Sequence, residues 1–165
     1  MTETAPAATA DDGPKGIGGW LVLPAIGLVV TPFWILITFV RDLLPVFDGE
    51  TWAMLTTPGS AVYHPALAPL LVFEVVGNIF LIAFTCYVIY LFFTRSRKLP
   101  AFIIAWLLIS GAIVAIDTFW GLLVPIVAAD ADASYYKDVI RAVIAIAIWV
   151  PYFGMSKRVK NTFVE

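Results

Sequence analysis

The 165-residue sequence has few residues of the kinds that carry catalytic or metal chemistry. Cys86 is the single cysteine, which excludes an internal disulfide and a multi-cysteine metal site. His64 is the single histidine, so the chain cannot supply two histidines to a haem. Neither residue has the partners that Cys/His or Ser/His/Asp catalysis requires. We therefore assign no catalytic residue, no cofactor and no metal site, and expect His64 at an interface and Cys86 as a small apolar residue.

Charged residues are also scarce, because Asp, Glu, Lys and Arg make up 13% of the sequence and hydrophobic residues 61%. An ordinary soluble domain is about 25% charged and about 45–50% apolar. A soluble fold of this length could not bury so much apolar surface, so the composition predicts a membrane protein with the lipid bilayer as its surroundings. No basic stripe suited to nucleic acid is present, and we expect no nucleic-acid partner.

The first fifteen residues lack the apolar character of the remainder. Residues 1–15 are polar, acidic and rich in Pro, Ala and Thr, which is typical of a disordered tail. We do not expect them to form a signal peptide, because the segment before the first apolar run is acidic and that run is too long. The predicted organisation is a tail at 1–15 followed by one membrane domain at 16–165.

Four long apolar segments lie in that domain. A hydrocarbon core about 30 Å thick needs about 20 helical residues. The predicted spans are 20–40, 65–93, 100–129 and 139–155. The fourth span is long enough to cross only if it includes Arg141. The simplest interpretation is that the Arg141 side chain extends back to the membrane interface. If the chain had only two or three spans, the last apolar segment would lie on the membrane surface, or one terminus would be translocated across the membrane. We predict an all-α, four-helix transmembrane bundle.

The basic residues predict an orientation, since no Lys or Arg lies between Arg41 and Arg95. With four spans, the N-terminal tail, the 94–99 loop and the C-terminal tail share one side. The basic residues of that side are Lys15, Arg95, Arg97, Lys98, Lys157, Arg158 and Lys160. The opposite side holds Arg41, Lys137 and, if it reaches the interface, Arg141. Because basic loops stay inside, both termini are expected in the cytoplasm.

The first outer loop contains a candidate helix. Asp48 precedes "GETWAMLT" and is of a residue type that caps helix N-termini. We predict that a short interfacial helix can form here, the alternative being a plain surface loop. Trp52, Tyr63 and His64 would place the loop at the outer interface.

Span one begins with residues that weaken helices in water, in "GIGGWLVLPAIGLVV". In lipid, small residues allow helices to approach closely. Pro24 and Pro32 are each expected to remove one backbone hydrogen bond and to leave a carbonyl that needs another partner. The candidate helix-contact residues are Gly18, Gly19, Pro24 and Gly27; the alternative is that prolines are simply common in membrane helices. The candidate interface anchors are Trp20, Trp149, Tyr152, Lys157, Arg158 and Lys160.

The ionisable residues inside the spans are few and costly, at about 2.5–3.5 kcal/mol each at the membrane centre. At 1.5 Å per residue, Glu74 lies roughly 13–14 Å and Asp117 roughly 16–18 Å from the outer end. Asn78 shares a helix face with Glu74. We predict a buried polar cluster of Glu74, Asn78, Asp117 and Arg141, in which Arg141 pairs with one carboxylate. The second carboxyl would be protonated or paired with Arg41. The alternative is that such a cluster only locks helices together.

Three stretches resemble a known family: "KGIGGWLVLPAIGLVVTP", "YHPALAPLLVFEVVGN" and "IWVPYFGMSKRVKNTFV". They resemble the bacterial membrane proteins of domain-of-unknown-function family 2569, the YdgK-like proteins, over about residues 15–164 and all four spans. The resemblance implies a four-helix protein of the bacterial inner membrane. It implies no reaction, so no catalytic residue is carried over.

Three functions are consistent with the sequence. The leading expectation is a small non-enzymatic accessory or interaction protein whose partner is a second copy or another membrane protein. The alternative is a proton-coupled small-molecule carrier or membrane sensor that uses Glu74 and Asp117. The third is an enzyme acting on a lipid or a quinone, which would need several polar groups converging in one pocket.

Overall fold

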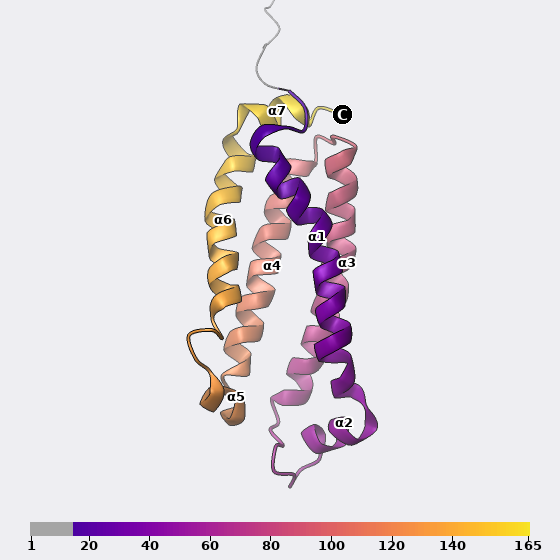
Figure 1. Cartoon of the computed structure of the whole chain (residues 1–165), viewed down its shortest axis with the longest axis vertical. Helices are drawn as coiled ribbons and strands as arrows, with labels where there is room; N and C mark the ends of the chain where they lie inside the picture. The colour runs from indigo at the N-terminus through magenta and orange to yellow at the C-terminus, as the bar shows by residue number, and fades with distance from the viewer. Residues whose placement is uncertain (1–14) are drawn as a thin grey trace, which may run out of the picture.

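The protein, described by a computed structural model over residues 15–165, is built on four long helices (Figure 1). These are α1 (Val22–Thr38), α3 (Leu67–Phe93), α4 (Leu99–Gly121) and α6 (Lys137–Met155). Each, taken with any flanking turns, is long and apolar enough to cross a membrane. No strand occurs in residues 15–165. The all-α, four-helix transmembrane fold is therefore confirmed, while the tail predicted at 1–15 lies, but for its last residue, outside the described residues.

Helix α1 continues at both ends as turns of other helix types. A 3₁₀ turn, η1 (Gly19–Leu21), precedes it, and a π turn, η2 (Phe39–Leu43), and a 3₁₀ turn, η3 (Leu44–Phe47), follow it. Pro24 lies in the first turn of α1, where its missing N–H would have no intrahelical acceptor in any case. Only Pro32 interrupts the hydrogen bonding of the helix interior, whereas we expected both prolines to do so.

The predicted short helix of the first loop is present as α2 (Gly49–Thr56). Asp48 caps it, because its Oδ1 accepts the backbone N–H groups of Glu50 at 3.0 Å and Thr51 at 2.8 Å. The Thr51 backbone and hydroxyl hydrogen bonds hold the pKa of Asp48 below its usual value, and the Glu50 N–H adds to this effect.

Helix α4 ends at Gly121 instead of continuing to residue 129. Pro125 is the cause, since the residue before a proline avoids the helical region and Val124 is extended (ψ 114°). Pro125 then begins a separate short helix, α5 (Pro125–Asp130). Helices α2 and α5 lie at the same end of the bundle, at the bottom of Figure 1.

The four long helices pack in the spatial order α6–α4–α3–α1, so α6 and α1 are the two edges. Two glycines allow the close approaches. A Cβ added at Gly111 of α4 would lie 2.7 Å from the Cδ1 of Ile146 on α6. One added at Gly77 of α3 would lie 3.3 Å from the Cγ2 of Ile113 on α4. Small residues therefore mediate helix contact here, as expected in membranes.

The C-terminal segment closes the other end of the bundle. Ser156 is extended (ψ 124°) and begins α7 (Lys157–Thr162), which lies across the ends of the long helices (Figure 1). Val159 and Phe163 are buried in the main apolar core with Leu21 and Phe92. This segment is thus part of the core and is more than a tail resting on lipid.

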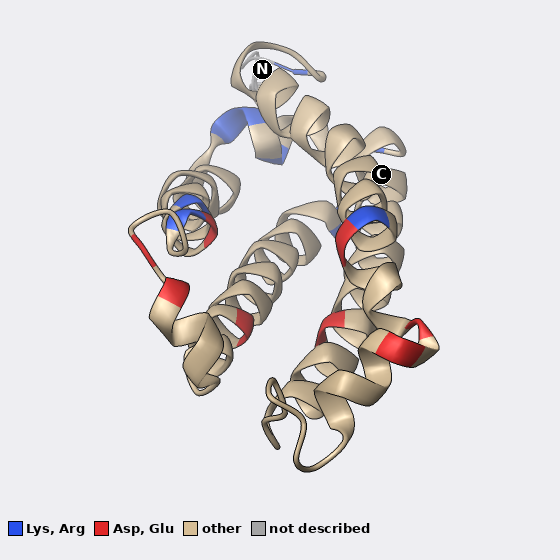
Figure 2. Cartoon of the chain, turned by 60° about the horizontal axis from the view of Figure 1, so that its bottom comes forward, with Lys and Arg blue, Asp and Glu red and all other residues tan. Residues whose placement is uncertain are grey.

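The chain's last residue is tied to the loop between α3 and α4. The Arg97 N–H donates to the Glu165 carbonyl at 2.8 Å, and the Glu165 N–H donates to the Arg95 carbonyl at 3.2 Å. The N-terminal entry to α1, this loop and the C-terminus therefore lie together. Basic residues gather around α7 in Figure 2, whereas acidic residues gather toward α2 and α5.

Candidate functional site

Helices α3 and α4 bring two carboxyl groups together. Glu74 and Asp117 are the only acidic residues of these helices, both are half-buried, and both line one small cavity of about 110 Å³. The two carboxyl groups therefore border a common space between the helices. Asn78, one turn after Glu74, lines the same cavity, and its side-chain amide donates to the Glu74 carbonyl at 2.9 Å. Three of the four residues predicted to cluster are therefore neighbours.

Arg141 does not pair with either of these carboxyl groups. Its Nη1 donates to Asp138 Oδ1 at 2.9 Å, and the two side chains are 75% and 73% exposed. Asp138 lies three residues earlier on the same helix face, so this local pair forms without bending the side chain toward α4.

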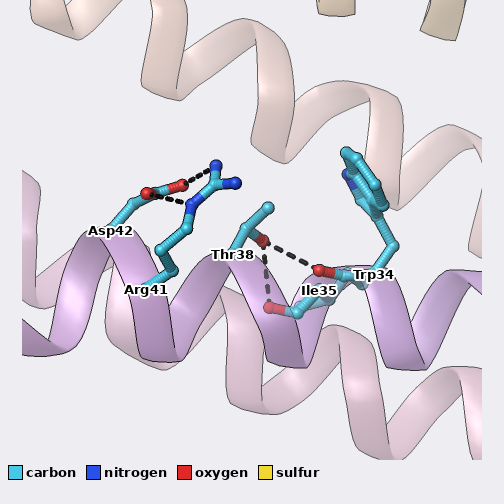
Figure 3. Close-up of polar contacts among 5 residues, drawn as sticks. All are labelled: Trp34, Ile35, Thr38, Arg41 and Asp42. Atoms are coloured by element: carbon cyan, nitrogen blue, oxygen red, sulfur yellow. Dashed lines mark hydrogen bonds and ion pairs between the residues drawn. The ribbon is translucent and has the colours of Figure 1, made fainter.

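Arg41 is also engaged locally. Its Nε and Nη2 donate to the two carboxylate oxygens of Asp42 at 2.7 and 2.8 Å (Figure 3). Neither arginine therefore forms an ion pair with Glu74 or Asp117, although Arg141 and Asp138 line the same cavity as Asp117. The Oδ1 of Asp117 is enclosed and has no hydrogen-bond partner among residues 15–165.

The carboxyl pair lies between two further cavities. One, of about 800 Å³, is bounded by α1, α4, the start of α6 and the 134–135 turn, and Asp117 and Asn78 line it. The other, of about 250 Å³, lies between α1 and α3 and is lined by Glu74, Asn78 and Asp42. Because Asn78 lines all three cavities, they adjoin. We call these three cavities around Glu74, Asn78 and Asp117 the acidic cleft.

Helix α1 supplies one wall of the acidic cleft. Trp34 and Thr38 both line the largest cavity. The Thr38 hydroxyl lies 3.0 Å from the carbonyls of both Trp34 and Ile35 (Figure 3). The π turn follows at once, and such turns often mark functional positions. In Figure 3, Trp34, Thr38 and Arg41 project to the same side of α1.

Tyr135 supplies the opposite wall and was missed in the sequence. Its hydroxyl donates to the Thr118 carbonyl at 3.0 Å, and it sits against Gly121, where no Cβ would fit. Burial, and then the negative charge of Asp117, raises the pKa of Tyr135. Asp132 orders the turn, since its Oδ1 accepts the N–H groups of Ser134 at 2.7 Å and Tyr135 at 3.3 Å. The "DAS" turn was the one available signal, but nothing in the sequence indicates where Tyr135 docks.

Gly27 and Pro24 lie beside a separate, apolar cavity of about 170 Å³ between α1, α4 and α6. Pro24 is buried, but no atom lies within 4 Å of a Cβ added at Gly27. Gly27 therefore leaves space instead of bringing another helix into contact, which differs from the expectation.

Gly18 and Gly19 contact a side chain of α7 rather than another span. Added Cβ atoms would lie 3.1 and 3.3 Å from the Nη1 of Arg158. Gly19 also has a positive φ of 54°, which favours glycine. The predicted anchor Arg158 thus packs over the start of α1.

The other predicted anchors lie near the same end. Trp20 is 66% exposed, and Lys157 and Lys160 are exposed. Trp149 and Tyr152 are half-buried, with ring centroids 5.6 Å apart. Of the two single residues, Cys86 is exposed on α3, and the His64 Nδ1 accepts the Ala66 N–H at 3.3 Å.

Comparison with known proteins gives a family and a curated relative. The model of the family described as "Protein of unknown function (DUF2569)" matches residues 14–164. The inner membrane protein YdgK of Escherichia coli (strain K12) is 30% identical over 152 residues, which are 92% of this chain and 96% of the relative. No solved structure matches. The relative and the four apolar helices support a multi-pass protein of the inner membrane. Since the match includes all four long helices, the chain belongs to the DUF2569 family.

Proposed function

We propose that the protein is a proton-coupled membrane carrier that exchanges a proton for a small cation at Glu74 and Asp117. The observation that carries the proposal is the position of these two carboxyl groups, which come from neighbouring helices, line one cavity and form no ion pair within residues 15–165. This geometry favours the carrier over the leading expectation of an accessory protein, since mere helix locking needs no cavity.

Two carboxyl groups that line one small cavity at membrane depth would hold one proton between them, because like charges in a poorly solvated site cannot both ionise. The other titratable or charged groups at the acidic cleft do not alter this. Asp42 and Arg41 neutralise each other on α1, as do Asp138 and Arg141 on α6. Tyr135 is neutral at physiological pH, because its pKa is raised.

A bound cation would replace the shared proton. The empty site, with one proton on two carboxyl groups, carries one negative charge. When a monovalent cation binds and the proton leaves, both groups are ionised and the charge of the site with its ligand is still minus one. The enclosed Asp117 Oδ1, which accepts no hydrogen bond in residues 15–165, provides a carboxylate oxygen that can attract that cation electrostatically.

Proteoliposomes carrying the full chain and an internal pH dye test this exchange with external tetramethylammonium. The expected result is a rise of luminal pH, since each entering cation sends a proton out. A hydrogen bond or contact to a charged group contributes about 1.5–3 kcal/mol, so Glu74→Gln and Asp117→Asn should slow the exchange by about tenfold or more.

Matched controls come from exposed acidic residues at the α2 and α5 end of the bundle. Glu50→Gln in α2 and Asp130→Asn at the end of α5 change charge equally but lie outside the acidic cleft. Both should exchange at the wild-type rate. If Glu74→Gln and Asp117→Asn also do so, the carrier proposal is wrong.

The accessory role is a second candidate, favoured by one observation. Helices α1 and α6 are edges of the bundle that do not pack closely on each other, so a helix of a partner protein or of a second copy could lie between them. Crosslinking from Val143→Cys, an exposed position on α6, would identify the partner. Under the accessory role one discrete crosslinked product is expected, and under the carrier role none.

We further propose that the α7 end faces the cytoplasm. Seven basic residues lie at this end: Lys15, Arg95, Arg97, Lys98, Lys157, Arg158 and Lys160. Short basic segments remain on the cytoplasmic side during insertion. In inside-out vesicles of a cysteine-free chain, a membrane-impermeant thiol reagent should label Lys160→Cys and not Ser60→Cys; the reverse pattern would contradict this orientation.

A further inference from the structure

Resting on the proposed exchange at Glu74 and Asp117, we infer that the cation is the head group of an amphiphile whose apolar chain lies in the cavity beside Gly27. The ligand class is an alkyl chain carrying one positive charge. It would lie along the space between α1 and α6, with its head in the acidic cleft and its chain directed toward α7.

The two halves of this space adjoin at one residue of α1. The apolar cavity is bounded by α1, α4 and α6, and so is the largest cavity of the acidic cleft. Thr31 of α1 lines both. Its hydroxyl donates to the Gly27 carbonyl at 2.7 Å, so the polar atom is satisfied within the helix and presents no unpaired donor to a passing chain.

The half nearer α7 is built from apolar side chains. Leu107 of α4, with Trp149 and Phe153 of α6, faces Leu23 and Leu28 of α1 across it. The core beyond, which includes buried Phe153 and Val159, closes this half at the α7 end. At 1.5 Å per residue, the α1 wall from Leu23 to Thr31 is about 12 Å long, which accommodates a medium-length alkyl chain.

The half nearer α2 and α5 is suited to a positive charge. Both arginines at this half are taken up by Asp42 and Asp138, so Glu74 and Asp117 remain as uncompensated acids. Trp34 and Tyr135 line the same cavity, and aromatic faces attract cations. The carboxyl groups of Glu74 and Asp117 would repel an anionic head group. A zwitterionic head group would bring a negative group into the same acidic surroundings.

The position of the space also favours an amphiphile over a water-soluble cation. It lies between the two edge helices, whose remaining surfaces are apolar and exposed, including Val29, Val30 and Val143. A ligand already dissolved in the bilayer could therefore enter sideways, with its chain exchanging lipid contacts for protein contacts of similar polarity.

The test measures binding to the full chain in lipid nanodiscs, with proton release as a second readout. The probes are tetramethylammonium, decyltrimethylammonium and decyl sulfate, with ligand-free nanodiscs subtracted. Decyltrimethylammonium should bind and release protons, and decyl sulfate should not bind. Gly27→Leu should weaken decyltrimethylammonium binding by about tenfold, because the new side chain occupies the space of several methylene groups. Its effect on tetramethylammonium should be small.

Gly154→Leu is the matched control, since Gly154 is also exposed on a long helix with no atom within 4 Å of an added Cβ, but lies outside both cavities. It should bind both cations as the wild type does. Equal weakening of both cations by Gly27→Leu, or binding of decyl sulfate, would overturn the amphiphile inference while leaving proton exchange intact. Loss of proton release with every cation would instead overturn the proposed function.

Discussion

The Tyr135 hydroxyl donates a hydrogen bond to the Thr118 carbonyl at 3.0 Å, which fixes the 131–136 loop beside Asp117. The contact joins residues far apart in sequence and closes one wall of the acidic cleft over α4. Because Gly121 leaves room for the phenol, the loop can approach the helix end closely. This relationship makes the loop, and not only the spans, part of the site.

Tyr135→Phe should loosen that wall without unfolding the bundle. The loss of one hydrogen bond costs about 0.5–1.5 kcal/mol, and the ring retains its packing. Cation-driven proton exchange should fall severalfold while the melting temperature changes little. Tyr136→Phe is the control, because no hydrogen bond of the Tyr136 hydroxyl is seen in the described chain, and equal exchange rates in the two variants would show that the Thr118 contact is unimportant.

Gly111→Leu should destabilise the contact between α4 and α6. An added Cβ would already lie 2.7 Å from Ile146, and overpacking of this kind costs about 1–3 kcal/mol. Thermal unfolding in detergent should show a clear decrease in midpoint. Gly27→Leu provides the comparison, since that position is open, and a Gly111→Leu chain as stable as Gly27→Leu would contradict the packing described.

Phe163→Ala should be among the most destabilising single changes. The side chain is 4% exposed and packs against Phe92 with ring centroids 5.4 Å apart. Removing a buried phenylalanine costs about 3–5 kcal/mol. Val164→Ala removes an exposed neighbour and should be nearly neutral. If both variants have the melting temperature of the wild type, the C-terminal segment is a surface tail and does not belong to the core.

The cap of α2 should respond to acid. The hydrogen bonds from Thr51 and Glu50 depress the pKa of Asp48 in the folded chain, so the cap stabilises α2 above the usual aspartate range and the contribution is lost as pH falls through the depressed value. Amide signals of Glu50 and Thr51 should therefore be constant near neutral pH and shift only below about pH 4. In Asp48→Ala the two signals should lack this acid transition; a transition that persists would mean that another group holds the amides.

The spans could be predicted from the sequence because each is a long, predominantly apolar run, and the hydropathy of such a run is enough to indicate a membrane-spanning helix. The end of α4 was misjudged because Pro125 and Val124 are apolar, so hydropathy continues where the backbone turns. Likewise, the core position of Phe163 follows from a reversal at Ser156 that the basic residues after it conceal.

The site was only partly predictable for a related reason. Helical periodicity places Asn78 beside Glu74, and depth places Asp117 at a similar level. Helix packing decides which helices are neighbours and which way a long side chain points. That packing cannot be inferred from a single sequence. Arg141 could reach α4 or Asp138, and the nearer acid on its own helix prevails. Tyr135 had no periodicity to mark it.

The most direct test of the account is infrared spectroscopy of the full chain in nanodiscs at neutral pH. Glu74 and Asp117 should together retain one proton, which gives a protonated-carboxyl band that disappears when tetramethylammonium is added. The band should shift in Glu74→Gln and Asp117→Asn and remain unchanged in Glu50→Gln. A wild-type spectrum with no protonated carboxyl near neutral pH would show that both groups are ionised independently, and would contradict the shared-proton site.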